Sequence, residues 1–282
     1  IEDQAVTADR SFSVPWTYDC TKDPTNGILH DSHQHDEMPL TVNQILVESS
    51  NIGTIKVGKE LGYERAHHYL TAFGLGSTTA LDFPGESAGI LKPWQQWEGT
   101  ERCTILYGQG LASTPIQLAA AVNVIANDGV YASPQLVTHT VEPDGSLQPA
   151  PAGPTRRVIS ESTAEQMQLM MRDVVCLGTA QDARVAGLSV AGKTGTAYKA
   201  QADGTYFNAD GITHDYYSSF VGFFPAEDPQ VTILISIDEP KSGFNSGGQA
   251  AAPLFQELVP TIRHELGIIP PRGSVDCNGN GA

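Results

Sequence analysis

Strand-like stretches in the C-terminal half constrain the fold more than any other part of the sequence. We expect strands over residues 189–197, 216–224 and 230–238, and the last two are rich in β-branched and aromatic side chains. Residues 225–229 (Pro-Ala-Glu-Asp-Pro) are turn formers that separate the second strand from the third. A connection this short joins antiparallel neighbours. The sequence therefore predicts an antiparallel hairpin with a further strand before it.

Helix signals precede and follow these strands. Thr41 with Gln44, and Thr114 with Gln117, form capping boxes, in which each side chain bonds the other residue's backbone. Ser162 with Glu165 indicates a further helix start of the same kind. The expected helices cover residues 40–48, 52–61, 63–73, 114–127, a segment beginning at Ser162, and 251–266, and between them we expect a strand over 135–141 and a loop over 143–154.

Charge excludes some classes of partner. The 282 residues carry a formal net charge of -16, with 32 acidic and 16 basic side chains. A nucleic-acid partner would require a basic face, and an anionic membrane surface would repel this chain. We therefore expect no nucleic-acid partner. The hydrophobic content of 40% is enough for a sizeable core. The sequence contains no run of 18 or more apolar residues, so it predicts no membrane-spanning helix.

The cysteines and histidines form no recognisable metal pattern. Cys20, Cys103, Cys176 and Cys277 are too widely spaced for a C-x-x-C motif, so one or two disulfides and buried free thiols remain equally open. Three histidines at positions 30, 33 and 35 match no standard ligand spacing, which favours a solvated polar loop. We predict no metal and no cofactor.

The most informative polar segment is Val-Ala-Gly-Lys-Thr-Gly-Thr-Ala at 190–197. Lys193 and the hydroxyls of Thr194 and Thr196 can bind a ligand carboxylate, while Gly195 would let a ligand backbone approach closely. Residues 187–194 also fit a phosphate-binding loop, G-x-x-x-x-G-K-T. That motif requires a helix to begin at the Lys-Thr, whereas this segment reads as a strand.

A second polar segment is Ser-Ser-Asn at 49–51, directly after a predicted helix. Alone, it is best interpreted as a helix C-terminus made of small polar residues. A Ser-x-Asn followed by a Lys-Thr-Gly, however, forms two of the three motifs of penicillin-binding proteins and serine β-lactamases. Ser49, Asn51 and Lys193 are therefore the candidate catalytic residues, with Thr194, Gly195 and Thr196 as candidate substrate-binding residues.

The order of several segments strengthens this interpretation. Ser-Ser-Asn-Ile-Gly at 49–53, Tyr-Gly-Gln-Gly at 107–110, Thr-Pro-Ile-Gln at 114–117 and Gly-Lys-Thr-Gly-Thr-Ala at 192–197 follow one another at family-like intervals. Together they resemble the transpeptidase domain of class B, or monofunctional, penicillin-binding proteins, which cross-link the bacterial cell wall in division or elongation. The resemblance covers roughly residues 38–266.

The resemblance implies an α+β fold with an antiparallel sheet of about five strands, flanked by helices. It implies that Ser49 relays protons, Asn51 binds the substrate amide, and Lys193 supplies positive potential. Thr194 and Thr196 would bind the substrate carboxylate, and the Thr196 N–H would contribute to an oxyanion hole. The implied partners are a peptidoglycan stem peptide ending in D-Ala-D-Ala, β-lactams and a glycosyltransferase.

One family motif is missing. None of the seven lysines has a serine three positions before it, so no Ser-x-x-Lys nucleophile motif is present. We expect a transpeptidase domain over 1–269, cut shortly after its nucleophile and inactive alone, with a loose C-terminal tail over 270–282. The whole protein would act at the outer face of the bacterial membrane. The alternatives are a degenerate interaction domain, or a β-lactamase or β-lactam sensor of the same superfamily.

Overall fold

The central sheet of the computed structural model has three antiparallel strands in the order β11–β10–β9. These strands are β9 (Ala191–Tyr198), β10 (Tyr216–Phe224) and β11 (Val231–Asp238), which confirms the predicted hairpin and the strand before it. β9 lies at one edge of the sheet. The structure describes residues 1–21, 27–81, 83–241 and 243–281.

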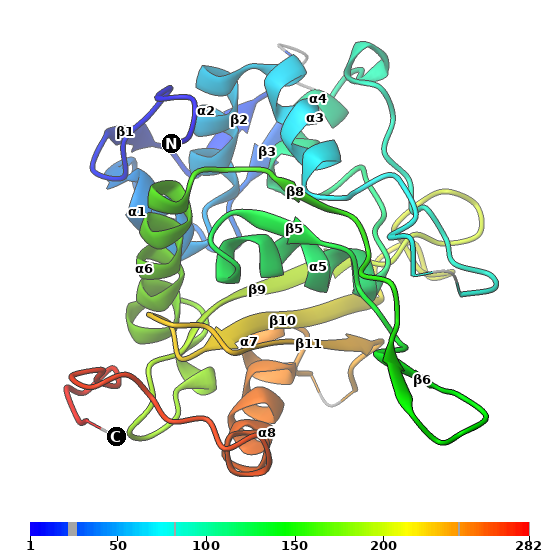
Figure 1. Ribbon diagram of the computed structural model, residues 1–282. Coiled ribbons are helices and arrows are strands. Elements are labelled where there is room, and N and C mark those ends of the chain that lie inside the picture. The colour runs from blue at the N-terminus through cyan, green and yellow to red at the C-terminus, as the bar shows by residue number, and fades with distance from the viewer. Residues whose placement is uncertain (22–26, 82, 242, 282) are drawn as a thin grey trace.

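The two faces of this sheet are covered by different helices (Figure 1). Phe220 and Phe224 of β10 are fully buried and meet the ring of Phe255 edge-on, at centroid distances of 4.9 and 6.2 Å. Phe223 points to the opposite face and packs with Met171. Because side chains alternate along a strand, the register of β10 decides which β9 side chains face each helix layer.

The helices fall close to their predicted positions. They are α1 (Val42–Glu48), α2 (Asn51–Leu61), α3 (Tyr63–Ala72), α4 (Glu101–Thr104), α5 (Pro115–Ala126), α6 (Glu161–Leu177), α7 (Gly247–Ala250) and α8 (Ala252–Glu265), with short 3₁₀ turns η1 (Trp94–Gln96), η2 (Ile105–Tyr107) and η3 (Gln181–Ala183). α5 and α6 cover one face of the sheet, and α7 and α8 cover the other.

The capping boxes at Thr41 and Thr114 are both formed, as predicted. The predicted start of α6 at Ser162 is wrong by two residues. Ser160 is the N-cap, because its backbone is extended and its hydroxyl accepts the Thr163 N–H.

The other strands pair locally instead of extending the central sheet. They are β1 (Ser11–Val14) with β4 (Met38–Thr41), β2 (Thr17–Asp19) with β3 (Ile28–His30), β5 (Val130–Ala132) with β8 (Thr155–Arg157), and β6 (His139–Val141) with β7 (Leu147–Pro149). The expected five-stranded sheet is therefore three-stranded over the described residues. The strand predicted at 135–141 is short, and part of the predicted loop at 143–154 forms its hairpin partner β7, which projects from the body (Figure 1).

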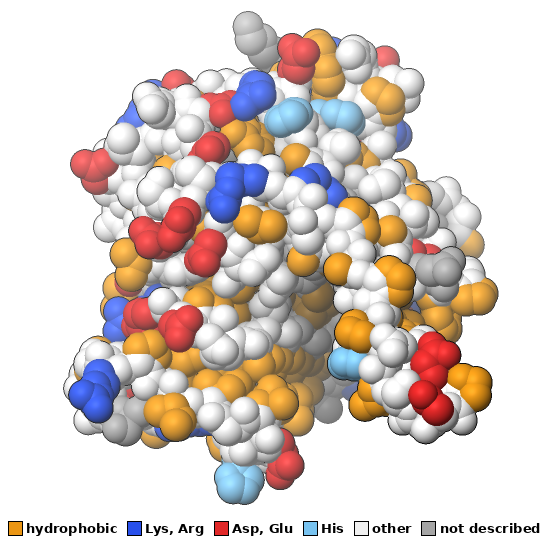
Figure 2. All heavy atoms as spheres, in the orientation of Figure 1, with side chains coloured by type: hydrophobic (Ala, Val, Ile, Leu, Met, Phe, Trp, Pro, Cys, Tyr) orange, Lys and Arg blue, Asp and Glu red, His pale blue; other side chains and the backbone are white. Residues whose placement is uncertain are grey.

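Two disulfides fix the outer segments. Cys20 is bonded to Cys103, and Cys176 at the end of α6 is bonded to Cys277. The expected loose tail is wrong over residues 270–281, because this disulfide holds them and Asp276 is 3% exposed, accepting the Gly187 N–H. On the face shown in Figure 2, basic side chains are scattered among other side chains. No helix in the described part of the chain is long and apolar enough to cross a membrane.

Candidate active site

The Ser-Ser-Asn segment forms a tight turn between α1 and α2. Ser49 ends α1 in the left-handed conformation, with φ 57° and ψ 38°, which is uncommon for a residue other than glycine. Ser50 is the N-cap of α2 and accepts the Gly53 N–H at 2.9 Å, and Asn51 is the first residue of that helix. The turn therefore presents Ser49 and Asn51 from the meeting point of two helices.

Lys193 reaches this turn from the edge strand β9. It pairs with Val221, and its side chain lies on the face of the sheet that α5 and α6 cover. Its Nζ donates to Ser49 Oγ at 2.7 Å, although the two residues are 144 positions apart. The structure thus brings together the two segments that the sequence singled out.

The environment of Lys193 favours proton exchange. Burial lowers the pKa of its ammonium group to about 8, because the surrounding protein solvates a charge less well than water does. Besides Ser49, the nearest partners of Nζ are the carbonyl oxygen and hydroxyl of Thr194, at 3.2 and 3.4 Å. An amine with such a pKa is present in both charge states near neutral pH, so it can exchange protons with the Ser49 hydroxyl.

The two threonines of β9 alternate with Lys193 and Gly195 along the strand. The Thr194 hydroxyl is 2.8 Å from that of Thr179, and the Thr196 hydroxyl accepts the Gly247 N–H at 3.0 Å. Both hydroxyls are therefore oriented by neighbouring elements. Because Thr196 is exposed, its hydroxyl is accessible to a ligand lying along the strand.

Gly195 is required for packing within the sheet. A Cβ atom at this position would lie 2.5 Å from the hydroxyl oxygen of Ser219 on β10, which is far below a normal contact. From the sequence, the glycine was expected to allow the close approach of a ligand backbone. The structure shows a second reason for a glycine at position 195, which is the close packing of β9 against Ser219 of β10.

Asn51 is half-buried, and its side-chain Nδ2 donates to the carbonyl oxygen of His30 at 3.2 Å. The strand β3 therefore limits the orientation of this amide. Lys193 and Thr194 lie within β9, so the helix required by a phosphate-binding loop does not begin there.

Sequence reasoning assigned no individual role to three further residues, although one of them, Tyr107, lies in a segment that carries the resemblance. Thr179 follows α6 and orients Thr194, with only a Gly-Thr pair after a helix as a signal. Tyr107 is half-buried, and burial, with smaller effects of Tyr206 and Asp31, raises its pKa to about 12. Asp31 is buried in the loop interpreted as solvated and polar, so that interpretation is wrong for this residue. In the described residues, no group of three or more His, Cys, Asp or Glu side chains could hold a metal ion.

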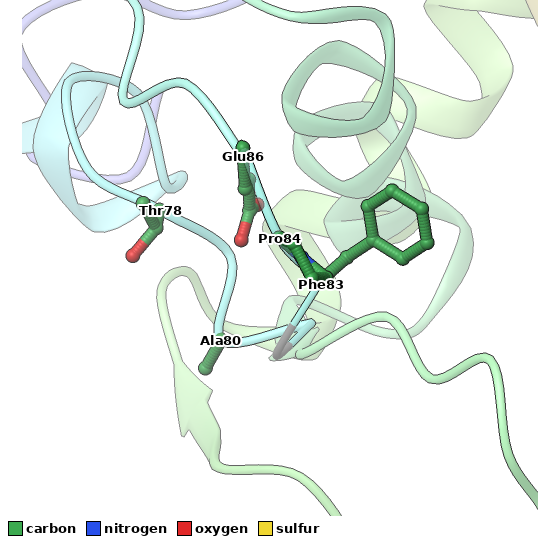
Figure 3. Close-up of a pocket in the computed structure, with 6 residues that line it drawn as sticks. Thr78, Ala80, Phe83, Pro84 and Glu86 are labelled. Atoms are coloured by element: carbon green, nitrogen blue, oxygen red, sulfur yellow. The ribbon is translucent and has the colours of Figure 1, made fainter.

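Two cavities lie outside these segments. A pocket of about 480 Å³ is formed by one loop and is lined by Thr78, Ala80, Phe83, Pro84, Gly85 and Glu86 (Figure 3). The Glu86 carboxylate accepts the Thr79 N–H at 2.8 Å, so its hydrogen bonds hold the loop closed on itself. A second, largely apolar groove of about 350 Å³ runs beside α1, α2 and α6, and its lining includes Ile1, Val6, Val42, Ile45 and Met170.

The family of the chain follows from a comparison with known families. The sequence model described as "Penicillin binding protein transpeptidase domain" matches residues 1–259. The chain belongs to this family. The expected class of protein is therefore confirmed.

Individual relatives give the same result. The chain is 38% identical to penicillin-binding protein PbpB of Mycolicibacterium smegmatis over 87% of its own length and 39% of the relative's. It is 34% identical to stage V sporulation protein D of Bacillus subtilis, over 84% of the chain and 36% of that protein. A crystal structure of penicillin-binding protein 3 from Mycobacterium tuberculosis with aztreonam superimposes with a TM-score of 0.84 and 33% identity, covering 98% of this chain and 61% of that one. The chain thus spans well under half the length of these two sequence relatives.

Proposed function

We propose that this chain is the larger part of a peptidoglycan D,D-transpeptidase domain that also binds β-lactams. The observation that carries the proposal is the 2.7 Å contact between Lys193 Nζ and Ser49 Oγ. It joins the Lys-Thr-Gly and Ser-x-Asn motifs of one family into one site. A non-catalytic interaction domain would not require a lysine of lowered pKa against a serine hydroxyl in this place.

The chemistry would proceed through an acyl-enzyme. A serine Oγ attacks the carbonyl carbon of the penultimate D-Ala of a stem peptide, a C–O bond forms, the C–N bond breaks, and D-Ala leaves with a proton on its nitrogen. The amine of a second stem peptide then attacks the ester, which forms the cross-link and frees the serine. Ser49, hydrogen-bonded to Lys193, would deliver the proton to the leaving nitrogen.

The remaining residues would bind and orient the substrate. Asn51 would hydrogen-bond the substrate amide, and the hydroxyls of Thr194 and Thr196 would hold its carboxylate. An extended peptide can lie along β9 because this strand is an edge of the sheet, and the Thr196 N–H would contribute to the oxyanion hole. A β-lactam presents a reactive carbonyl and a carboxylate in a similar arrangement. The crystal structure of the M. tuberculosis relative with aztreonam supports this part of the proposal.

The nucleophile would be supplied by a part of the protein outside these 282 residues, since no Ser-x-x-Lys occurs among them. The apolar groove beside α1, lined by Val42 and Ile45, supports this proposal because it could receive one face of an amphipathic helix. In this proposal the chain alone holds the binding half of the site and does not form an acyl-enzyme.

The cellular location is proposed from the cysteines. Two disulfides, Cys20–Cys103 and Cys176–Cys277, are typical of an oxidising compartment. We therefore place the domain outside the cytoplasm, at the outer face of the cell membrane, where its peptidoglycan substrate would be. A glycosyltransferase that makes the glycan strands would be its partner there.

The test is covalent labelling by a fluorescent penicillin. The 282-residue chain would be compared with the full-length gene product, and with the Lys193→Ala variant of that product. We expect label on the full-length protein, much less on the variant, and none on the chain alone. If the folded full-length protein takes no label, the transpeptidase proposal is wrong, and a degenerate interaction domain is favoured. Many turnovers of a chromogenic β-lactam would instead indicate a β-lactamase.

A further inference from the structure

Asp31 is a buried carboxylate directly behind the Ser49–Asn51 turn. It is 6% exposed and follows strand β3. Its Oδ2 accepts the Ser50 hydroxyl at 2.8 Å, and its Oδ1 accepts the Ile52 N–H at 2.9 Å. The two hydrogen bonds therefore lie on either side of Asn51 in the sequence.

The same short segment also holds the Asn51 side chain. The carbonyl oxygen of His30 accepts Asn51 Nδ2 at 3.2 Å, so residues 30 and 31 together bond three consecutive positions of the turn and helix α2. The Ser50 hydroxyl accepts the Gly53 N–H while it donates to Asp31. The hydroxyl proton of Ser50 therefore points to Asp31, and the two hydrogen bonds fix the orientation of the Ser50 side chain.

The carboxylate is itself held in place. The Asp31 N–H donates to the carbonyl oxygen of Trp16 at 3.1 Å, which ties the loop to the residue directly before strand β2. His35 Nε2 lies 3.1 Å from Asp31 Oδ2, and His35 Nδ1 lies 2.8 Å from the carbonyl oxygen of Asp36. Since both ring nitrogens face oxygen acceptors, first the Asp36 carbonyl and then Asp31 raise the pKa of His35. A buried carboxylate with this many partners is costly to disturb.

The backbone of the turn needs such support. Ser49 is held in the left-handed region, where a residue with a Cβ is strained. Lys193 approaches from a different element, β9, so the hydrogen bond to Ser49 depends on where the turn holds that residue. A relaxation of Ser49 towards ordinary backbone angles would move its hydroxyl away from Lys193.

We propose that Asp31 is a positioning residue of the transpeptidase site, which holds the Ser-x-Asn turn so that Ser49 meets Lys193 and Asn51 faces the substrate. This inference rests on the proposed function. Asp31 does not touch the reacting atoms. It acts through Ser50 and Ile52, and its contribution is to the geometry of acylation.

The chain offers a matched control. Asp276 is also a buried aspartate, 3% exposed, that accepts backbone N–H groups, from Gly187, Asn278 and Asn280. It lies in the C-terminal segment and contacts none of the candidate site residues. In both Asp31→Asn and Asp276→Asn, one carboxylate oxygen is replaced by an NH₂ group, which cannot accept a hydrogen bond. Only the first change alters the Ser-x-Asn turn.

The first experiment measures acylation of the full-length protein by a fluorescent penicillin, resolved into the affinity of the non-covalent complex and the acylation rate constant. Misplacement by about 1 Å can slow a reaction about 10²-fold, so we expect Asp31→Asn to lower the rate constant by about 10- to 100-fold with a small change in affinity. Asp276→Asn should leave both unchanged. Equal rate constants for the two variants at comparable thermal stability would overturn the inference.

A second experiment keeps this inference separate from the proposed function. A crystal structure of the 282-residue chain with Asp31→Asn should show Ser49 Oγ more than about 3.5 Å from Lys193 Nζ, beyond hydrogen-bonding distance. An unchanged contact would overturn the positioning role, even if the full-length protein acylates. Failure of the unaltered full-length protein to acylate would instead overturn the proposed function, while the crystal structure would still test the positioning.

Discussion

The buried ammonium group of Lys193 leads to a quantitative prediction about stability. Its pKa is lowered from 10.5 to about 8 by burial. Above pH 8 the folded protein releases this proton, whereas the unfolded chain keeps it up to about pH 10.5. Because the unfolded state then binds one more proton, the free energy of unfolding rises with pH in this interval. One pH unit of full difference corresponds to about 1.36 kcal/mol. Because the folded lysine has already lost half of its protons at pH 8, the rise from pH 8 to pH 10 is about 2 kcal/mol.

The assay is urea unfolding of the 282-residue chain at a series of pH values between 7 and 10, for the unaltered protein and for Lys193→Met. The methionine has no ionisable group, so the difference between the two proteins isolates Lys193 from the tyrosines and the other lysines. We expect that difference to be flat below pH 8 and to change by about 1.36 kcal/mol per pH unit above it.

Lys199 supplies the control for this prediction. It is paired with Glu239 and Asp238, which raise its pKa, so Lys199→Met should not remove the rise between pH 8 and pH 10. In NMR spectra of protein with ¹³C-labelled lysine, one of the seven amines should titrate near pH 8. If Lys193→Met keeps the same pH dependence as the unaltered protein, or if no lysine titrates below about pH 9.5, the burial argument is refuted.

Other substitutions test the packing around the site and at the chain ends. Gly195→Ala should lower the melting temperature and slow acylation of the full-length protein, because the new Cβ would meet the Ser219 hydroxyl. Adding Ser219→Ala in the same chain should restore much of both properties. A double variant that is no more stable and no faster than the single variant would contradict this cause. Cys277→Ser should make residues 270–281 sensitive to proteases and lower the free energy of unfolding by about 2–5 kcal/mol, and an equally resistant tail would show that its hydrogen bonds suffice. The Asp3 carboxylate accepts a hydrogen bond from Arg65, which holds the pKa of Asp3 at about 2. This carboxylate therefore stabilises the fold above about pH 4, and the effect is lost as pH falls towards 2. Asp3→Asn should reduce the decrease in the free energy of unfolding between pH 4 and pH 2, and an unchanged decrease would exclude the pair as its cause.

The sequence alone specified the local structure well where one signal acts over a few residues. Thr41 and Thr114 begin helices because each is followed three positions later by a glutamine that completes the capping box. The hairpin of β10 and β11 followed from residue type and a five-residue turn. The family and both motif segments, with Ser49 and Lys193, are also evident in the sequence, since they depend only on the order of residues along the chain.

The errors arose where two local solutions compete or where distant contacts decide. Ser160 and Ser162 both offer a capping hydroxyl, and only the extended backbone of Ser160 selects between them. Nothing in the residue order indicates that residues 270–281 are held in place, because Cys277 meets Cys176 over a separation of 101 residues. The number of about five strands in the sheet came from the family resemblance, whereas the other strands of the described chain pair locally in two-stranded sheets. A strand signal in the sequence does not say which neighbour a strand will pair with.

The site shows the same division. Residue types determined which groups the proposed chemistry would use, namely a lysine, a serine, an asparagine and two threonine hydroxyls. The tertiary structure decided that Lys193 crosses 144 positions to meet Ser49, that its ammonium group is buried, and that Asp31 holds the turn from behind. Periodicity and capping act within a few residues along the chain, whereas burial and orientation come from elements that are distant in sequence and adjacent only in the folded protein.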